Sequence, residues 1–371
     1  MNCRRVRKIV FMNFELQIAH SVQEIGQEAW DRLAGERPFA SYRWYRFGET
    51  VLTDNTPIYV VLSRRGEPVA RGTFWLRSRE QLPVSSPIAR HLIEALLRRW
   101  PLLICRAPLV ESPGLILPDP PLRDAALKTI AQVALEQAER HRASFLGYIY
   151  LKPQETAYPG WPDTLATVKM PEPRTHLAIT APDFKSYLGG LSRSTRKDYR
   201  RHRKRAAARD IEVSEHPLTA PLNGTLLDQA VTLIENVERR HGSSHHPWAR
   251  EMLKHAHTVD AIWLTAEIGE RLVGCDLLFG DRDTWVMTLL GLDYEVEYVY
   301  FQLMYAPIRC AIEKGAQTLW GGSGAYEMKQ RLGFQVESQH HVLFAGRGPW
   351  FHRLGRRVAA MEGKDKGPPD P

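Results

Sequence analysis

The chain has 371 residues, of which 43% are hydrophobic and 25% charged, as in a soluble globular protein long enough for about two domains. It contains no apolar run near the roughly 18 residues that a membrane-spanning helix requires. The formal net charge of +8 is uneven, because the segment from Arg193 to Asp210 alone holds nine Lys or Arg against two Asp.

Cysteine spacing excludes two further kinds of protein. The sequence has no C-x-x-C pair and no cysteine cluster, so it indicates neither a disulfide framework nor a zinc site. The four cysteines are Cys3, Cys105, Cys275 and Cys310. We therefore expect reduced thiols and no bound metal.

The N-terminal segment differs from the rest of the chain. Four basic residues precede only four apolar ones, which is too short an apolar stretch for a signal peptide, so we expect a cytoplasmic protein. The first clear strand pattern begins at Phe14. Residues 1–13 are therefore predicted to be a basic disordered extension, unless translation starts at Met12.

Two segments, one in each half of the chain, read as strand, tight turn and strand. The first runs from Tyr59 to Trp75 around Gly66, and the second from Ile262 to Phe279 around Gly269, with one extra residue. Each is followed, after other elements, by a helix and a buried strand. This layout predicts a duplicated α/β domain rather than a repeat array.

The predicted helix and strand pairs are 125–142 with 144–150 and 303–314 with 317–320. Proline-rich sequence between Pro153 and Pro173 separates the halves, since proline breaks helices and central strands. We predict one domain over 14–173 and a second over 174–345. Residues 346–371 are predicted to form a short helix over 349–361 and a disordered tail.

The most basic segment is a predicted helix that opens the second domain. At about 100° per residue, five cations share one stripe, opposite Tyr199, His202 and Ala206. The five are Arg193, Arg196, Lys197, Arg200 and Lys204. Such a stripe suits RNA phosphates, an anionic membrane surface or a diphosphate-linked glycan, and it is equally compatible with an ordinary solvated helix.

Four segments of the second half carry a resemblance to a known family. They are 191–200, the Gly269-Glu270 turn, 300–305 and 326–334, the last reading Tyr-Glu-Met-Lys-Gln-Arg-Leu-Gly-Phe. In this order they resemble the Fem-type branch of the GNAT acyltransferases, which includes peptidoglycan-bridge aminoacyltransferases and cellulose-biosynthesis acetyltransferases. The resemblance implies an α/β (α+β) fold of two tandem GNAT-like domains, each a mixed central sheet flanked by helices.

Two departures from acetyl-CoA GNAT enzymes bear on the donor. Where those enzymes have a glycine-rich loop that binds the CoA pyrophosphate, residues 291–300 lack the glycine pair and carry three acids. Where many of them have a tyrosine four residues before the closing glycine, this chain has Lys329. Fem-type enzymes have a lysine in this neighbourhood, and an ammonium can stabilise a developing oxyanion.

The candidate catalytic residues are Lys329, Tyr326 and Asp293. Glu295 and Glu297 are alternative proton acceptors, and a solvated helix lysine remains the alternative interpretation of Lys329. The predicted donor-binding residues are the five cations above together with Tyr300 and Ser323. Five histidines between His241 and His257 match no metal-binding spacing and favour a loop bordering the acceptor.

We therefore predict a transferase that moves an acyl or aminoacyl group to an amine of a small molecule or cell-envelope precursor, in a cleft between domains. No cofactor is expected to be bound permanently. The donor remains open between acyl-CoA and aminoacyl-tRNA. O-acylation of a glycan and a non-catalytic module that binds RNA or a membrane are the alternatives, and the sequence leaves the oligomeric state open.

Overall fold

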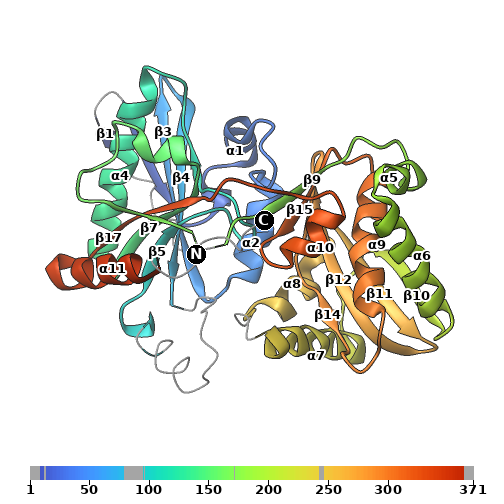
Figure 1. The fold of residues 1–371 in the computed structure, drawn as a ribbon. Coiled ribbons are helices and arrows are strands. Elements are labelled where there is room, and N and C mark those ends of the chain that lie inside the picture. Colours follow the sequence, from blue (N-terminus) through green and yellow to red (C-terminus); the bar gives the residue numbers. More distant parts are fainter. Residues whose placement is uncertain are drawn as a thin grey trace. The chain divides into compact units, whose positions relative to one another are not determined.

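A computed structural model describes residues 9–11, 14–78, 95, 97–170, 172–241 and 246–362. These residues divide into two compact units, which Figure 1 draws together. The first unit takes in the described residues before 79, those in 95–172 and those from 338 onward, and the second takes in residues 173–337. No helix in these ranges is long and apolar enough to cross a membrane.

The first unit is built on a sheet of nine strands among the described residues. They are β1 Ile9–Phe11, β2 Phe14–Ala19, β3 Asn55–Arg64, β4 Glu67–Arg77, β5 Leu102–Cys105, β6 Leu115–Ile116, β7 Phe145–Leu151, β8 Ala166–Lys169 and β17 His341–Gly346. The helices are η1 Val22–Glu24, α1 Gln27–Ala34, α2 Tyr42–Val51, α4 Leu122–Arg140, η2 Pro153–Ala157 and α11 Gly348–Glu362. The sheet order is β1-β2-β3-β4-β5-β7-β17-β8, with β6 beside β4.

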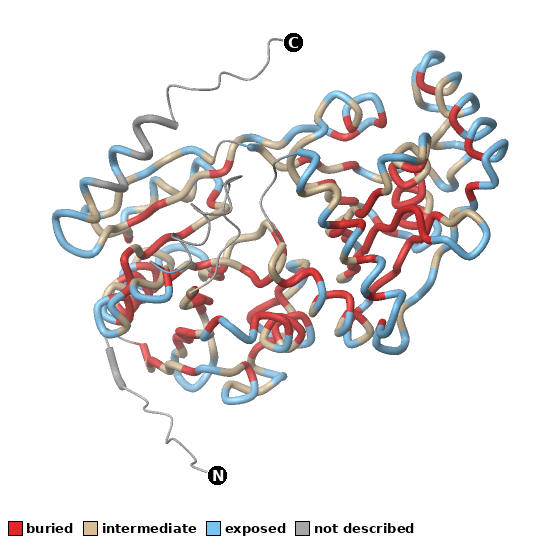
Figure 2. Tube along the Cα trace, turned by 90° about the horizontal axis from the view of Figure 1, so that it is seen from below, coloured by how far each residue is buried: buried red, intermediate tan, exposed pale blue. Residues whose placement is uncertain are grey.

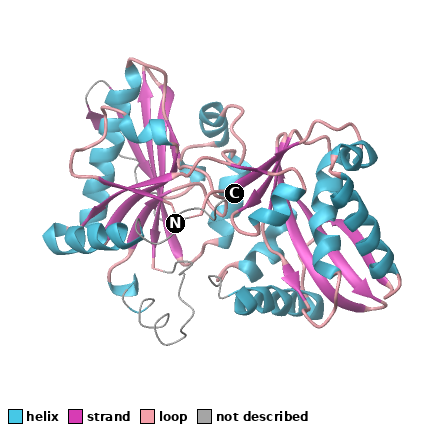
Figure 3. Ribbon diagram, viewed as in Figure 1, coloured by secondary structure: helices cyan, strands magenta, loops and turns pink. Residues whose placement is uncertain are grey.

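The second unit repeats this plan with eight strands among the described residues. They are β9 Thr175–Ala178, β10 Ile211–Pro217, β11 Asp260–Ile268, β12 Arg271–Asp281, β13 Thr284–Met287, β14 Gly291–Leu292, β15 Thr318–Gly322 and β16 Gln335–Val336. The helices are α5 Phe184–Gly190, α6 Arg193–Ala207, α7 Gly224–His241, α8 Ala249–His255, η3 Ala256–Thr258, α9 Val299–Glu313 and α10 Tyr326–Arg331. The sheet order is β10-β11-β12-β13-β15-β9-β16, with β14 beside β12. Figure 3 shows the strands of this unit in magenta and the helices beside them in cyan.

Both predicted hairpins are confirmed. The β3–β4 turn has positive φ at Arg65 and Gly66, and the β11–β12 turn has positive φ at Gly269, which glycine adopts without steric cost. Both hairpins carry a register shift two residue pairs from the turn, between Leu62 and Ser63 in the first and between Ala266 and Glu267 in the second. The predicted helices of each half form α4 and α9, and the strands that follow form β7 and β15.

Each sheet receives one strand from a distant part of the sequence. In the first unit β17 lies between β7 and β8 and pairs antiparallel with both, and in the second β9 lies between β15 and β16. The predicted division at 345 is therefore wrong for residues 338–345. β17 lies between β7 and β8, so its backbone N–H and C=O groups pair with both strands and join them in the first sheet.

The predicted extension at the N-terminus also needs a correction. Ile9–Phe11 forms β1 and pairs antiparallel with β2, so this part of the segment adds a strand to the sheet edge. The rest of residues 1–13, like the predicted tail from 363, lies outside the described residues. The predicted helix near the C-terminus is present as α11.

The two faces of the second sheet are covered by different helices. A side-chain carbon at Gly274 of β12 would meet Val299 and Leu303 of α9, so Gly274 lies directly under that helix. Gly291, which pairs with Cys275, faces Leu233 of α7 instead. In Figure 2 the buried residues of this unit gather in its interior, where strand residues such as Leu264 and Leu278 pack with Leu303 of α9 in one core.

Candidate active site

Lys329 lies on α10, immediately after β15, and only 6% of its surface is exposed. Its Nζ donates hydrogen bonds to the carbonyl oxygens of Gly322 at 3.4 Å and Ser323 at 3.0 Å. Two backbone acceptors therefore hold the ammonium in place. Such a position is uncommon for lysine, which is almost never buried without partners.

The glycine run before α10 gives the carbonyls of Gly322 and Ser323 this geometry. A side-chain carbon at Gly321 would come within 2.8 Å of both Phe334 and Thr175 Oγ1, so this position has no room for one. Gly322 and Gly324 have φ of +66° and +76°, which favour glycine. The Thr175 hydroxyl donates to Gly322 O at 2.8 Å and ties the turn to β9.

A second buried charged side chain, Asp276, lies on β12. It is 1% exposed and shares the α9-facing side of the strand with Gly274 and Leu278, because strand side chains alternate between faces. Neither carboxyl oxygen of Asp276 has a hydrogen-bond partner among the described residues. An acid with both oxygens unpaired in a core is destabilising, so its presence here points to a function.

Burial raises the pKa of the Asp276 carboxyl to about 7. The N–H groups of Leu277 and Leu289, which lie near the carboxyl without reaching hydrogen-bond geometry, and the positive charge of Lys329 oppose this rise without removing it. Burial, with the Asp276 charge as a smaller cause, also raises the pKa of the neighbouring Cys275 thiol to about 12, so that thiol stays protonated. The pKa of Asp276 therefore lies near neutral pH, and the charge of the buried Lys329 ammonium acts on it.

The sheet separates next to these two residues. β13 and β15 pair in parallel only as far as Val286 and Trp320. β13 stays paired with β12 up to Met287, and Thr288 continues that register, since its N–H and its hydroxyl both donate to Leu277 O, at 3.0 and 2.6 Å. The pairing of β13 with β15 therefore ends while β13 is still beside β12, and the sheet opens between β13 and β15.

The predicted catalytic residues other than Lys329 make structural contacts. The Tyr326 hydroxyl donates to Pro173 O at 2.9 Å, and Asp293 forms an ion pair with Arg271 and accepts from Glu295 N at 3.0 Å. The structure therefore brings Lys329 and Ser323 together but gives Tyr326 and Asp293 other partners. Among the predicted proton acceptors Glu297 is also engaged, in an ion pair with Arg209 at 2.7 Å.

The basic helix is α6, and its buried side holds Thr195, His202 and Ala206. Arg196 departs from the predicted stripe, because its Nη1 donates to the carbonyls of Gly189 at 2.9 Å and Leu191 and so closes the end of α5. The other four members of the stripe are exposed, namely Arg193, Lys197, Arg200 and Lys204. Tyr300, in the first turn of α9, is half-buried and packs on Phe301.

The loop before α9, which stands where acetyl-CoA GNAT enzymes have a glycine-rich loop, contacts the C-terminal end of α6. Tyr298 adopts a left-handed conformation, with φ of 74°, just before α9. Its hydroxyl accepts from Arg205 at 2.7 Å, and the Arg209 guanidinium lies 4.8 Å from its ring. The histidines at 241, 246, 255 and 257 form no group of three ligands, and within the described ranges none exists that could hold a metal. His245 lies outside these ranges.

Sequence patterns alone did not identify Asp276 as a candidate site residue. The signal was present, since an acid interrupts the apolar strand Leu272 to Phe279, where a charge is not expected. That pattern alone gives neither the face of the strand nor its neighbour Lys329, which is 53 residues later in the chain.

Comparison with known protein families decides the family. The sequence pattern of the FemAB-like family, described as peptidoglycan biosynthesis/recognition, matches residues 21–348. The chain belongs to the FemAB-like family. Membership makes it a transferase of the acyl- or aminoacyltransferase type. No curated protein matches the sequence.

Solved structures of similar fold share the tandem arrangement of this FemAB-like chain. FemX superposes with a TM-score of 0.57 and 11% identity over 92% of this chain and 99% of its own. A tandem GNAT protein from the clavulanic acid biosynthesis pathway superposes with a TM-score of 0.52 and 12% identity over 90% of this chain and 99% of its own. The L-PGS from Bacillus licheniformis superposes with a TM-score of 0.52 and 11% identity over 91% of this chain and 96% of its own. At these identities the likeness shows the fold.

Proposed function

We propose that the second unit transfers an aminoacyl group from an aminoacyl-tRNA to an amine of a cell-envelope precursor. The observation that carries the chemistry is the buried Asp276 carboxyl near the held ammonium of Lys329. The family description, peptidoglycan biosynthesis/recognition, supports an envelope acceptor. The exposed cations of α6 support a polyanionic donor.

The proposed reaction needs no protein nucleophile. The amine nitrogen attacks the carbonyl carbon of the aminoacyl ester, and the bond from that carbon to the ribose oxygen breaks. The amine proton passes to the Asp276 carboxylate and then to the leaving ribose oxygen, which departs as a hydroxyl group. Lys329 stabilises the negative charge that develops on oxygen.

The pKa of Asp276 fits this role. A proton acceptor works best when its pKa lies near the working pH, because it is then ionised in part and still basic enough to remove a proton. Burial provides this by raising the pKa to about 7. An exposed carboxylate with its usual pKa near 4 would be a much weaker base.

The second candidate donor is an acyl-CoA. It is favoured by the tandem GNAT protein of similar fold, whose structure is described as lacking AcCoA. The loop before α9 argues against it, since Asp293 and Glu297 occupy the place of the phosphate-binding glycines. Mass spectrometry of the purified protein after incubation with a cell extract tests both donors, because it identifies a co-purifying tRNA or CoA. If neither donor is retained or consumed, the proposal is wrong.

Charge reversal on α6 tests the tRNA donor. Changing Lys197, Arg200 and Lys204 to Glu should lower affinity for aminoacyl-tRNA at least a hundredfold in dilute salt and flatten the salt dependence, because each phosphate contact releases counterions. Arg196 is left intact because it holds α5. Filter binding at several salt concentrations measures the effect.

The matched control reverses three exposed arginines of α11 in the first unit, Arg353, Arg356 and Arg357. Both variants change the net charge by −6. Equal losses in the two variants would mean that tRNA responds to overall charge, and the role given to α6 would then be incorrect.

A further inference from the structure

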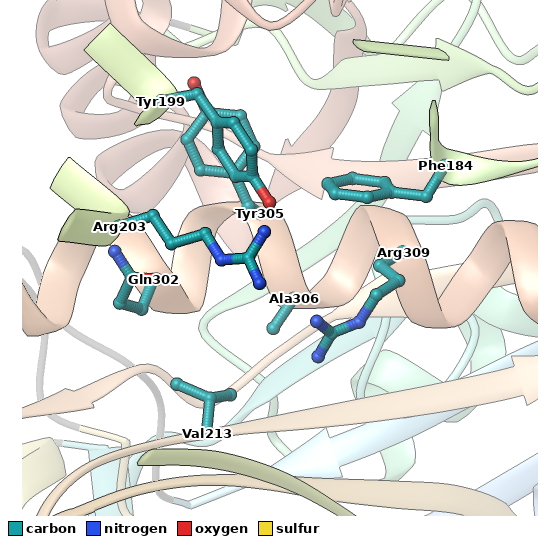
Figure 4. A pocket seen from close by; sticks show the side chains of 8 residues that line it. All are labelled: Phe184, Tyr199, Arg203, Val213, Gln302, Tyr305, Ala306 and Arg309. Atoms are coloured by element: carbon teal, nitrogen blue, oxygen red, sulfur yellow. The ribbon is translucent and has the colours of Figure 1, made fainter. Parts of the chain in front are cut away.

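The second unit contains a hollow that the reaction above does not use. It has a volume of about 210 Å³ and lies between α5, α6, α9 and β10 (Figure 4). Its α9 side is formed by Gln302, Tyr305 and Arg309, which recur at helical spacing and so share one face of that helix. The hollow is below the roughly 300–1,000 Å³ of drug-sized sites, so it suits a small group or one unit of a chain.

Two guanidinium groups converge in this hollow. In Figure 4 Arg203 of α6 and Arg309 of α9 point toward each other from opposite sides. Nε and Nη2 of Arg309 both lie 3.2 Å from Glu215 Oε1 on β10. Nη1 of Arg309 takes no part in this ion pair. None of the described residues that line the hollow is acidic. Two converging guanidinium groups favour an anion between them, and a phosphate matches their geometry.

Aromatic rings form the wall beside the two arginines. Tyr199 packs against Tyr305 with ring centroids 4.7 Å apart, and Phe184 lies 6.0 Å from Tyr199. The rings are already fixed by one another, so a planar group can pack on them at little entropic cost. Rings next to arginines are the usual combination for binding a nucleotide, whose base packs on the rings while the phosphate meets the cations.

The hollow shares one lining residue with a second cavity. Tyr305 lines this smaller cavity together with Met328 and Arg331, which flank Lys329 on α10. The exposed cations of α6 lead to the hollow from the other direction, since Arg203 belongs to the same helix. A ligand in the hollow would therefore lie between the basic helix α6 and α9.

We propose that this hollow is a nucleotide-binding subsite, with a phosphate between Arg203 and Arg309 and the base against Tyr199 and Phe184. It deepens the proposed function, on which it rests for its biological role, by holding a nucleotide unit of the donor away from the reacting ester. That unit is supplied either by an RNA strand or by a small nucleotide such as the adenosine end of CoA.

Binding to the full chain is measured by calorimetry with four probes, namely inorganic phosphate, AMP, CoA and a short single-stranded RNA. Arg203→Ala should weaken nucleotide binding about tenfold or more, because it removes charge-assisted hydrogen bonds. The matched control is Lys185→Ala, which removes an exposed cation beside Phe184 of α5 but not from the hollow. It should change AMP and CoA binding less than about twofold. If Arg203→Ala weakens the binding of AMP and CoA, the ligand of the hollow is a small nucleotide. If it weakens the binding of RNA alone, the ligand is an RNA strand.

Two results would overturn the subsite. One is equal weakening by Arg203→Ala and Lys185→Ala, or no binding of any probe. The other is AMP, CoA and RNA binding no more tightly than inorganic phosphate, which would remove the role of the rings. Because these experiments need no turnover, nucleotide binding without acyl transfer would refute the proposed function and leave the subsite intact.

Discussion

Replacing Lys329 by methionine should lower the rate of acyl transfer by roughly 10²–10³-fold, the usual cost of removing one stabilising group from a developing oxyanion. Methionine keeps most of the buried volume but removes the charge and both hydrogen bonds to Gly322 and Ser323. The loss should fall on the turnover number and leave donor affinity nearly unchanged. Single-turnover measurement of amide formation separates these two quantities.

The matched control for Lys329 is Gln330→Ala. Gln330 is the next residue of α10 and is exposed, so this change tests the helix without touching the ammonium. Gln330→Ala should keep wild-type rates. Full activity of the Lys329→Met variant would show that Lys329 is only a structural lysine of the helix.

Replacing Asp276 by asparagine should stabilise the protein at pH 8 and leave its stability nearly unchanged at pH 4. In the folded chain the pKa of Asp276 is raised to about 7, whereas in the unfolded chain it is near 3.9. The folded state therefore binds the proton more tightly. The stability that this tighter proton binding gives the wild-type protein is fully present below about pH 4 and is lost as the pH rises to about 7.

Asparagine is neutral throughout this range, so it avoids the cost of burying a charge. The gain in unfolding free energy at pH 8 should be at most about 4 kcal/mol, which follows from a net shift of about three pKa units that already includes the attraction to Lys329. Urea unfolding at pH 4, 6 and 8 measures it. Parallel pH profiles for the two proteins would mean that Asp276 does not titrate near neutrality.

Local sequence patterns were sufficient for much of the fold. The Gly66 and Gly269 turns fix their hairpins, because positive φ and the flanking β-branched residues act over a few positions. The cations of α6 could also be placed on an exposed side from helical spacing alone. Arg196 could not be separated from that stripe, since its two acceptors belong to the end of another helix.

Long-range pairing was out of reach of these patterns. Nothing local to residues 341–346 indicates that they insert between β7 and β8, roughly two hundred residues earlier in the chain. The same limit applies to the site. Lys329 was found from its motif, but Asp276 becomes meaningful only when the fold buries it under α9 with both oxygens unpaired.

The most direct test of the account is a double-mutant cycle on kcat/KM for amide formation, with Asp276→Asn, Lys329→Met and the combined variant. If the two side chains act on one reacting ester, each single change should cost roughly 10²–10³-fold and the double variant should be little worse than the more damaged single one. Losses that multiply, or single variants with wild-type kcat/KM, would contradict a shared catalytic site at Asp276 and Lys329.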